Sequence, residues 1–193
     1  MKGKIIMKEK IMAVDKSFDE AMFYTKADHI FIMILDSLRD RDMSIVRHYL
    51  SDEMYEKFNS LVQEYINEKK IRLFDEMNIK ETYIKDVEIT DDKINIEVIL
   101  TSRYMDYFVD EDGNYISGIN DHRIEKQHRM LFTKRRDAKE LGSARRCVNC
   151  GATLDINHTG LCPYCKNTTD MSEYDYIVTK MEKIVWKKDL FYF

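Results

Sequence analysis

The sequence predicts an α+β domain in which helices pack on one face of a curved antiparallel sheet. Two observations lead to this fold class. In the first part of the chain, up to about residue 70, apolar residues recur at helical spacing, and further along the period changes to that of a half-buried strand. Helices first and antiparallel strands after them are typical of α+β domains.

Three helices are expected in the first part of the chain. The first begins at Ser17-Phe18-Asp19-Glu20, which has the form of a capping box. A short second helix is expected from Asp42 to Tyr49, and Ser51 is expected to cap a third. The apolar residues at helical spacing are Phe23, Ala27, Ile30, Ile34 and Leu38 in the first helix, and Met54, Tyr55, Phe58, Leu61, Val62, Tyr65 and Ile66 in the third.

The strands are indicated by alternation and by turn residues. Ile94, Ile96, Val98 and Leu100 alternate with more polar residues, which predicts a half-buried strand. An earlier strand with Tyr83, Val87 and Ile89 should turn into it at Asp91-Asp92. Asp110-Glu111-Asp112-Gly113-Asn114 predicts a hairpin turn, followed by a return strand from Arg123 to Lys134. A last strand is expected from Tyr176 to Val185.

The four cysteines of the chain form two pairs with CxxC spacing, Cys147-Val148-Asn149-Cys150 and Cys162-Pro163-Tyr164-Cys165. Two such pairs can close a tetrahedron of thiolates around one metal ion, because each CxxC turn presents both sulfurs on one side. The spacing therefore predicts one structural Zn²⁺ ion with Cys147, Cys150, Cys162 and Cys165 as ligands. With all four positions taken by sulfur, the zinc would have no open site for water or substrate.

Other uses of the cysteines are less consistent with the sequence. Structural disulfides suit a secreted protein, and no signal peptide precedes the chain. A thioredoxin-like redox site would need one reactive CxxC at the start of a helix. Iron in a rubredoxin-like site uses similar thiolate pairs, so the sequence leaves zinc or iron open.

Composition excludes several classes of protein. A charged fraction of 34% with 44% hydrophobic residues is typical of a soluble globular protein. The longest apolar run, Ile30 to Leu35, is far shorter than the roughly 20 residues that span a bilayer. We therefore expect a cytoplasmic location, with peripheral association with a membrane left open. The net charge of −4 argues against attraction of the whole protein to nucleic acid.

A basic stretch, residues 134–146, leads into the cysteine pairs. Its basic residues are Lys134, Arg135, Arg136, Lys139, Arg145 and Arg146. We interpret the stretch as a solvated strand end and linker. The alternative is a patch that contacts phosphates, which would make this an RNA- or ribosome-associated protein. No aromatic residue is interleaved to stack on bases, which weakens that alternative.

The cysteine segment lies between the last two expected strands, which gives the domain organisation. Residues 1–14 are expected to be a flexible lead-in, and residues 15–142 and 171–193 to form the α+β domain. Residues 143–170 would be an inserted zinc ribbon. A segment of this size cannot build a core of its own, so metal binding would supply its folding free energy.

Three parts of the sequence together resemble one known family. Residues 15–42 match its first helix with a charged end, and Tyr104 to Asp110 with Gly113, Gly118 and Arg129 to Arg135 match its long hairpin. Cys147 to Cys165, followed by Tyr174 to Val178, matches the zinc-ribbon insertion of many bacterial members. The family is the Tim-forty-four-like domain, named after the mitochondrial inner-membrane import translocase subunit that tethers the import motor.

The resemblance, over residues 17–185, implies a cone akin to nuclear-transport-factor-two-like proteins, with three N-terminal helices packed on a curved antiparallel sheet. It also implies a non-catalytic binding or scaffold module that docks on proteins or membrane lipids. The apolar interior of the cone would accept a lipid, a peptide or a partner side chain. Met130 and Tyr176 stand where tryptophan is usual, and Lys166 replaces a common glycine. The extension that contacts the import motor has no counterpart in this sequence, so that activity is not transferred.

An enzyme is the alternative, since some dehydratases and isomerases share this fold. It would need an acid and a base pointing into the cone. His122 and His128 on one strand face, with Tyr104 and Asp106 on the paired strand, are the candidates. No triad, phosphate loop or carboxylate pair is recognisable, so we prefer a non-catalytic protein.

The chain ends in an aromatic segment, Trp186 with Leu190-Phe191-Tyr192-Phe193, which Lys187-Lys188-Asp189 interrupts. Its apolar part is too short for stable membrane insertion alone. We expect it to pack back on the core or to pair with a second copy of the chain. The partners considered are therefore other proteins, membrane lipids, nucleic acid and, in a homo-oligomer, a second copy of the chain.

Overall fold

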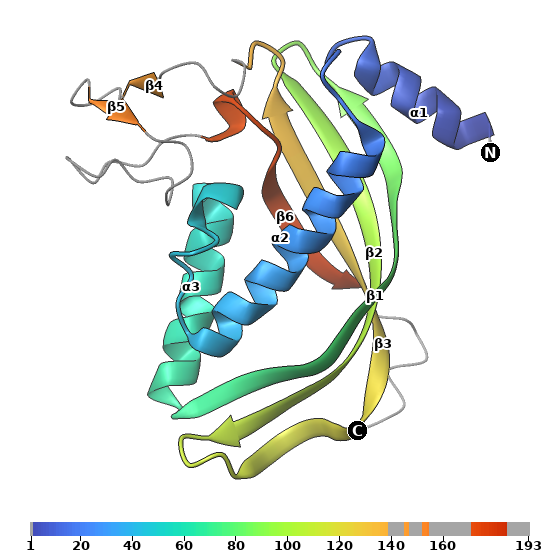
Figure 1. Cartoon of the computed structure of the whole chain (residues 1–193). Helices are drawn as coiled ribbons and strands as arrows, with labels where there is room; N and C mark the ends of the chain where they lie inside the picture. The colour runs from blue at the N-terminus through green and yellow to red at the C-terminus, as the bar shows by residue number, and fades with distance from the viewer. Residues whose placement is uncertain (1, 139–144, 147–151, 155–170, 185–193) are drawn as a thin grey trace.

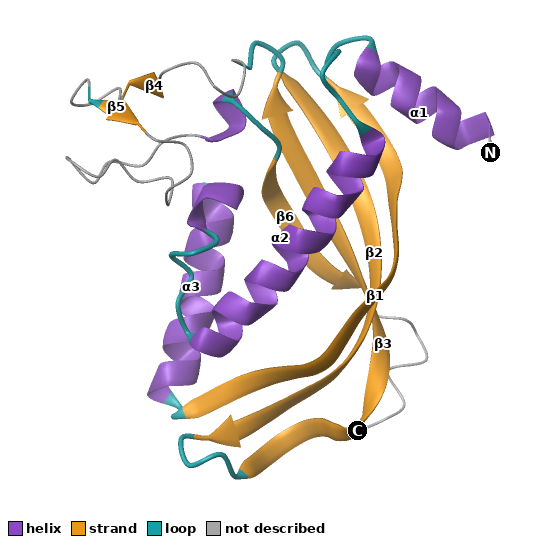
Figure 2. Cartoon of the chain, viewed as in Figure 1, coloured by secondary structure: helices purple, strands orange, loops and turns teal. Residues whose placement is uncertain are grey.

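The computed structural model describes residues 2–138, 145–146, 152–154 and 171–184. Their main feature is a four-stranded antiparallel sheet, in the order β1-β2-β3-β6, whose concave face is covered by helices (Figure 1, Figure 2). The predicted α+β class is therefore confirmed. The four cysteines and the aromatic C-terminal segment lie outside the described residues.

The strands follow one another as a meander. They are β1 (Lys70–Ile89), β2 (Lys93–Asp110), β3 (Tyr115–Arg135) and β6 (Ile177–Ile184). The predicted turns at residues 91–92 and 110–114 connect them, but β1 and β3 begin earlier than the alternation indicated. β6 pairs only with Gln127 to Thr133 of β3, so it borders the upper half of that strand.

Helix α2 (Glu20–Asp40) crosses the concave face and buries the predicted apolar stripe. Its cap differs from the prediction. Asp19 is the N-cap, and its carboxylate accepts a hydrogen bond of 2.9 Å from the Met22 amide. The Ser17 hydroxyl instead donates to Asp15 at 2.6 Å. Both side chains can cap a helix, and the neighbouring carboxylate of Asp15 decided between them.

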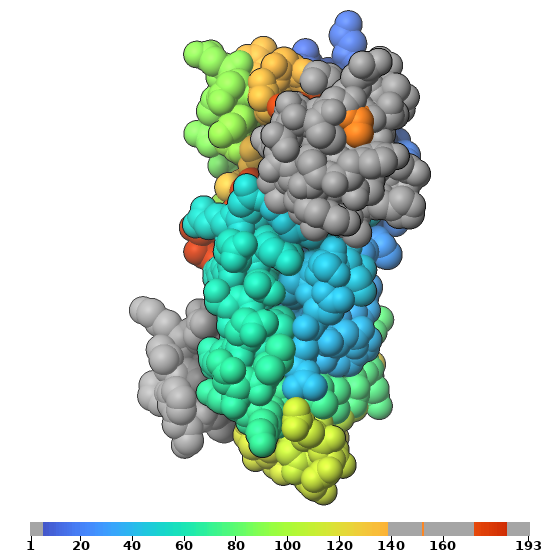
Figure 3. Space-filling model, turned by 90° about the vertical axis from the view of Figure 1, so that its left-hand side faces the viewer, coloured from blue at the N-terminus to red at the C-terminus, as the bar shows by residue number. Residues whose placement is uncertain are grey.

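The predicted second helix is wrong, whereas the third is confirmed. Residues 42–49 contain only a 3₁₀ turn, Arg47–Tyr49, because the Asp42 side chain accepts from the Ser44 amide at 2.8 Å and competes with helix formation. Ser51 caps α3 (Asp52–Asn67) as predicted, accepting from the Met54 amide at 3.3 Å. Figure 3 shows α2 and α3 covering this side of the molecule.

The prediction of a flexible lead-in over residues 1–14 is also wrong. Residues Lys2–Met12 form helix α1, which packs against β1 at one end of the sheet. The Ile11 side chain is fully buried, and Lys10 donates to the backbone carbonyl of Val87 at 2.5 Å. Among the described side chains of α1 only Ile11 is buried and charges are frequent, so the pattern gave no signal for this helix.

The core lies between α2 and the concave face of the sheet. Phe23 of α2 is the centre of an aromatic cluster, with its ring centroid 5.2 Å from Phe132 and 5.4 Å from both Phe18 and Tyr176. Such edge-on and tilted contacts add to the free energy of burying the rings. The cluster joins β3, β6 and the entry to α2 into one packed unit.

The opposite face of the sheet carries charged pairs. Lys85 and Arg129 both reach Glu97, at 2.8 and 3.5 Å, and Lys80 lies 2.9 Å from Glu125. Cross-strand ion pairs of this kind are typical of a solvated face. The core therefore lies on the concave side, although Ile99 and Thr101 of the opposite face are also buried.

Two glycines shape the hairpin between β2 and β3. Gly113 in the turn has a φ of +86° and open space around its Cα, whereas Gly118 has a φ of +105° and lies directly against β2. A Cβ at Gly118 would lie 2.5 Å from the Asp106 carbonyl oxygen. Gly118 therefore allows a close approach of two backbones as well as an unusual conformation.

The two glycines form a matched pair for a stability test. Gly113→Ala introduces only backbone strain and should cost about 1 kcal/mol. Gly118→Ala adds a backbone clash, so we expect a loss of about 2–4 kcal/mol in the free energy of unfolding. Urea denaturation of both variants measures the difference, and equal losses would contradict the role assigned to the close approach.

Candidate functional site

The predicted zinc ligands, Cys147, Cys150, Cys162 and Cys165, all lie outside the described residues, so the zinc site stays a prediction. The backbone on either side of the first pair is described. β4 (Arg145–Arg146) pairs antiparallel with β5 (Thr153–Leu154), so the first CxxC falls in the connection of a β-hairpin. In the part of the chain that the structure describes, no cluster of three metal-ligating side chains occurs.

The two ends of the cysteine segment leave the sheet side by side, because Thr133 of β3 pairs with Ile177 of β6. Asp15, in the turn between α1 and α2, holds both ends. Its carboxylate accepts from Lys134 Nζ at 2.7 Å and from the Tyr176 hydroxyl at 3.1 Å. Burial opposes ionisation, but these partners and Ser17 outweigh it and lower the pKa of Asp15. A buried carboxylate with several donors is a strong link.

Two further ion pairs hold the same region. Lys26 of α2 lies 2.6 Å from Asp175, just before β6, and Arg135 at the end of β3 lies 3.5 Å from Glu173. The second pair joins the two ends of the cysteine segment directly. The two ends of the cysteine segment are therefore held in place on the sheet, beside the start of α2.

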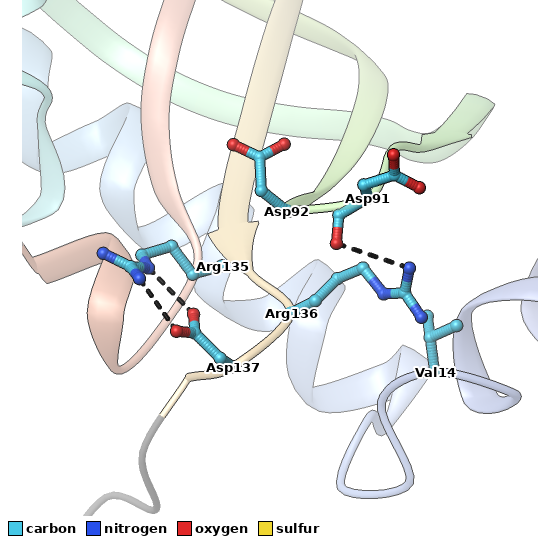
Figure 4. Close-up of a pocket in the computed structure, with 6 residues that line it drawn as sticks. All are labelled: Val14, Asp91, Asp92, Arg135, Arg136 and Asp137. Carbon is cyan, nitrogen blue, oxygen red and sulfur yellow. Dashed lines mark hydrogen bonds and ion pairs between the residues drawn. The ribbon is translucent and has the colours of Figure 1, made fainter.

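An open hollow of about 440 Å³ lies at this end of the sheet (Figure 4). It is lined by Val14, Asp91, Asp92, Arg135, Arg136 and Asp137. Its arginines are already engaged: Arg135 binds Asp137 with two bonds of 2.8 Å, and Arg136 donates to the Thr90 carbonyl at 3.2 Å and to the Asp91 carbonyl at 3.5 Å.

These contacts bear on the nucleic-acid alternative. Arg135 and Arg136 were two of its expected anchors, and the side chains of Arg145 and Arg146 are outside the described part. A phosphate would have to displace an internal carboxylate from Arg135 and would meet the nearby acids Asp91 and Asp92. The described part of the basic stretch therefore does not favour a phosphate-binding patch.

A second group of charges lies on the concave face of the sheet, around Asp106 of β2. Arg72 of β1 binds its carboxylate with two bonds of 2.8 Å, and Lys126 of β3 also binds it. The Tyr65 hydroxyl of α3 accepts from Arg72 at 3.1 Å. Burial opposes ionisation of Asp106, but Arg72 and Lys126 outweigh this and lower its pKa. The network ties three strands to α3.

The four residues of the enzyme alternative do not assemble into an acid–base pair. Asp106 is held ionised between two cations, which makes it a weak base. His122 is 65% exposed and contacts Asp121, because an irregularity in β3 takes residues 120–123 out of the pairing with β2. His128 is buried against the Phe31 ring, at a centroid distance of 4.8 Å. Tyr104 is buried beneath the Lys126 ammonium, 4.9 Å from its ring centroid.

His128 is nevertheless unusual. Its Nδ1 is buried without a hydrogen-bond partner in the described residues. Burial, together with the charges of Lys126, Lys183 and Arg72, lowers the pKa of His128 from 6.5 to about 4. The imidazole is therefore neutral at physiological pH. Sequence reasoning found this residue through its position on the strand, but its cationic neighbour Arg72 lies on a strand that is distant in the sequence.

Comparison with known families identifies the domain. The sequence model of the Tim44-like domain matches residues 7–144, which is most of the chain. The protein belongs to the Tim44-like domain family. The match begins within α1 and includes β1, β2 and β3, so the helix missed by the sequence analysis is part of the family domain. The cysteine pairs and β6 lie outside the matched residues, and no curated protein matches the chain.

The titration of His128 gives a test of its burial. Its neutral form is favoured in the folded protein, so its contribution to stability is full above pH 6.5 and is lost as the pH falls toward 4. A shift of this size corresponds to about 3 kcal/mol. We expect the free energy of unfolding of His128→Gln to change less between pH 7 and pH 4.5 than that of the unsubstituted protein.

His122→Gln is the control for this measurement, because His122 is exposed. Its denaturation curves should keep the loss of stability that His128 causes below pH 6.5, because His128 is unchanged in this variant. If His128→Gln also keeps the full dependence, His128 is not the buried neutral group described above.

Proposed function

We propose that this protein is a non-catalytic binding module of the Tim44-like family that tethers a protein partner, with a zinc ribbon as a rigid appendage. The observation that carries the proposal is the family match over the helices and the long strands. A second observation supports it: the candidate acid and base residues are occupied by internal contacts or stand apart. A module of this kind needs a fixed surface rather than a reactive group.

We propose that the partner contacts the concave side of the sheet where the strands extend beyond α2. Apolar side chains there are only partly buried, namely Phe74, Met77, Ile79 and Phe108. Arg72 lies over the rings of Phe74 and Phe108, at 5.0 and 5.5 Å from their centroids. Partly exposed aromatic and methionine residues beside an arginine are typical of the centre of a protein interface. A peptide or a lipid tail would use the same apolar surface.

The zinc would have a structural role and no catalytic one. Two CxxC pairs supply the thiolates, and the β4–β5 pairing around the first pair fits a zinc ribbon, in which a metal knuckle closes a hairpin. Because four sulfurs fill the coordination sphere, the ion would hold the segment together without Lewis-acid chemistry. Asp15, Lys26 and Arg135 would then fix the ribbon relative to the sheet.

The metal can be tested on purified, reduced protein. We expect one zinc ion per chain by native mass spectrometry and no visible absorption, because Zn²⁺ is colourless when bound to thiolates whereas iron is not. Cys150→Ser together with Cys165→Ser should abolish the bound ion and increase proteolysis within residues 139–170. Ser117→Cys, which adds an exposed thiol elsewhere, should leave the zinc content at one. Full-length, reduced protein without zinc would contradict the site.

Partner binding can be separated from the ribbon. Because Thr133 and Ile177 are paired, a short glycine–serine linker can replace residues 143–170 without moving the strands. We expect the full chain and this variant to retain the same protein from host extract. Met77→Glu should abolish retention, whereas Asn78→Glu on the neighbouring, exposed position should not. Equal retention by both point variants would place the interface elsewhere.

Membrane association is tested in parallel by flotation with anionic phospholipid vesicles. Within the described part of the chain, no helix has the length and apolar character needed to cross a bilayer. Flotation of the full chain without retention of any protein would favour a lipid partner over a protein partner. Failure of both assays would overturn the tethering function.

A further inference from the structure

Two polar groups on the concave face of the sheet are buried without partners. The Ser102 side chain is fully buried and His128 is 7% exposed. Neither Ser102 Oγ nor His128 Nδ1 has a hydrogen-bond partner among the described residues. Buried polar groups are almost always paired, and an exception calls for an explanation such as a bound molecule.

The two groups are neighbours. Leu100 pairs with His128 and Ser102 pairs with Lys126, so Ser102 and His128 are diagonal neighbours on adjacent strands. Residues in such positions lie within about 7–8 Å of each other, close enough for both side chains to contact the same small group. The described part of β6 pairs with β3 only as far as Ile184, opposite Gln127, so His128 lies close to the end of the described pairing.

The surroundings carry more positive than negative charge. Lys126 and Arg72 lie on neighbouring positions of the concave face, and Lys183 of β6 pairs with His128. Among the described residues, Asp106 is the carboxylate that acts on His128, and it is already bound by Arg72 and Lys126. From the helical layer, the uncharged Phe31 of α2 packs on the imidazole. A buried excess of positive charge favours an anionic ligand.

We propose that Ser102 and His128 form a binding site for a carboxylate. The Ser102 hydroxyl and the imidazole N–H of His128 donate to its two oxygens, while Lys126 and Arg72 supply the favourable field. A carboxylate fits these features because it is planar, accepts two hydrogen bonds and carries one charge. This deepens the proposed function, on which it rests for the concave binding surface, by naming the chemical group that the interior takes.

The test uses the full-length protein with ¹⁵N-labelled histidine. Titration with acetate at pH 7 should shift the imidazole resonances of His128 saturably and leave those of the exposed His122 unchanged. Acetamide, which has the same shape without the charge, should have no effect. Octanoate distinguishes the source of the group: tighter binding than acetate assigns an acid with an apolar chain, and equal binding assigns a short acid.

Ser102→Ala tests the site without removing a charge. Because Ser102 Oγ is unpaired in the ligand-free protein, its loss should not lower the melting temperature. It should weaken acetate binding by about tenfold or more, the usual effect of one hydrogen bond to a charged group. Ser117→Ala, at an exposed position of β3, is the matched control and should bind as the unsubstituted protein does.

Three results would overturn the proposal: no saturable shift of His128 with acetate, an equal shift with acetamide, or unchanged affinity in Ser102→Ala. Unchanged affinity in Ser102→Ala is also the result expected if an ordered water, rather than a carboxylate, bonds to Ser102 Oγ and His128 Nδ1. Carboxylate binding without retention of a protein partner would remove the tethering function but leave this site standing. Retention of a partner without carboxylate binding would remove this site but leave the tethering function standing.

Discussion

Burial of the concave face of the sheet by α2 is the constraint on which the rest of the structure depends. Ile30, Phe31 and Ile34 of α2 are completely removed from solvent against that face. The helix has 21 residues and is therefore about 31 Å long. β3 also has 21 residues, but as a strand it extends over about 70 Å. One straight helix cannot follow strands of that length, and α3 contacts the far part of the sheet through Tyr65, which packs on Phe108.

The network around Asp106 stabilises the far part of these long strands. There, Arg72, Asp106 and Lys126 link three strands, and Tyr65 connects them to α3. Charges can replace apolar packing there because each has a partner of opposite sign nearby. The arrangement has two consequences. It leaves a local excess of positive charge, and the apolar side chains Phe74, Met77, Ile79 and Phe108 near it are only partly buried.

The other end of the sheet holds the two segments that flank the cysteine pairs. Asp15, Lys26 and Arg135 hold the segments before and after the cysteine pairs, using partners from both strands that flank them. Such short, partly buried contacts fix the position of a segment even if each adds little to stability. The proposed binding surface and the strand ends that flank the cysteine segment are thus at opposite ends of one sheet.

The sequence by itself determined the elements whose signals are local. The apolar stripe of α2, the cap at Ser51, the turn at residues 110–114 and the alternation around Ile96 each involve residues close together in the chain, so pattern and propensity suffice. The CxxC pairs are equally local and predict their metal without the fold. Where two local signals competed, as at Ser17 with Asp15 and at Asp42 with Ser44, the sequence could not decide.

Only the tertiary structure decided the rest. Helix α1 forms because Ile11 finds a buried place beside β1, and its described side chains leave no periodic apolar pattern. Asp106 meets Arg72, and Asp15 meets Lys134, across distances in sequence that no motif spans. That Ser102 Oγ and His128 Nδ1 lack a partner among the described residues is likewise a property of the packed sheet. Contacts between distant segments depend on the register of the strands, and register is set by the whole fold.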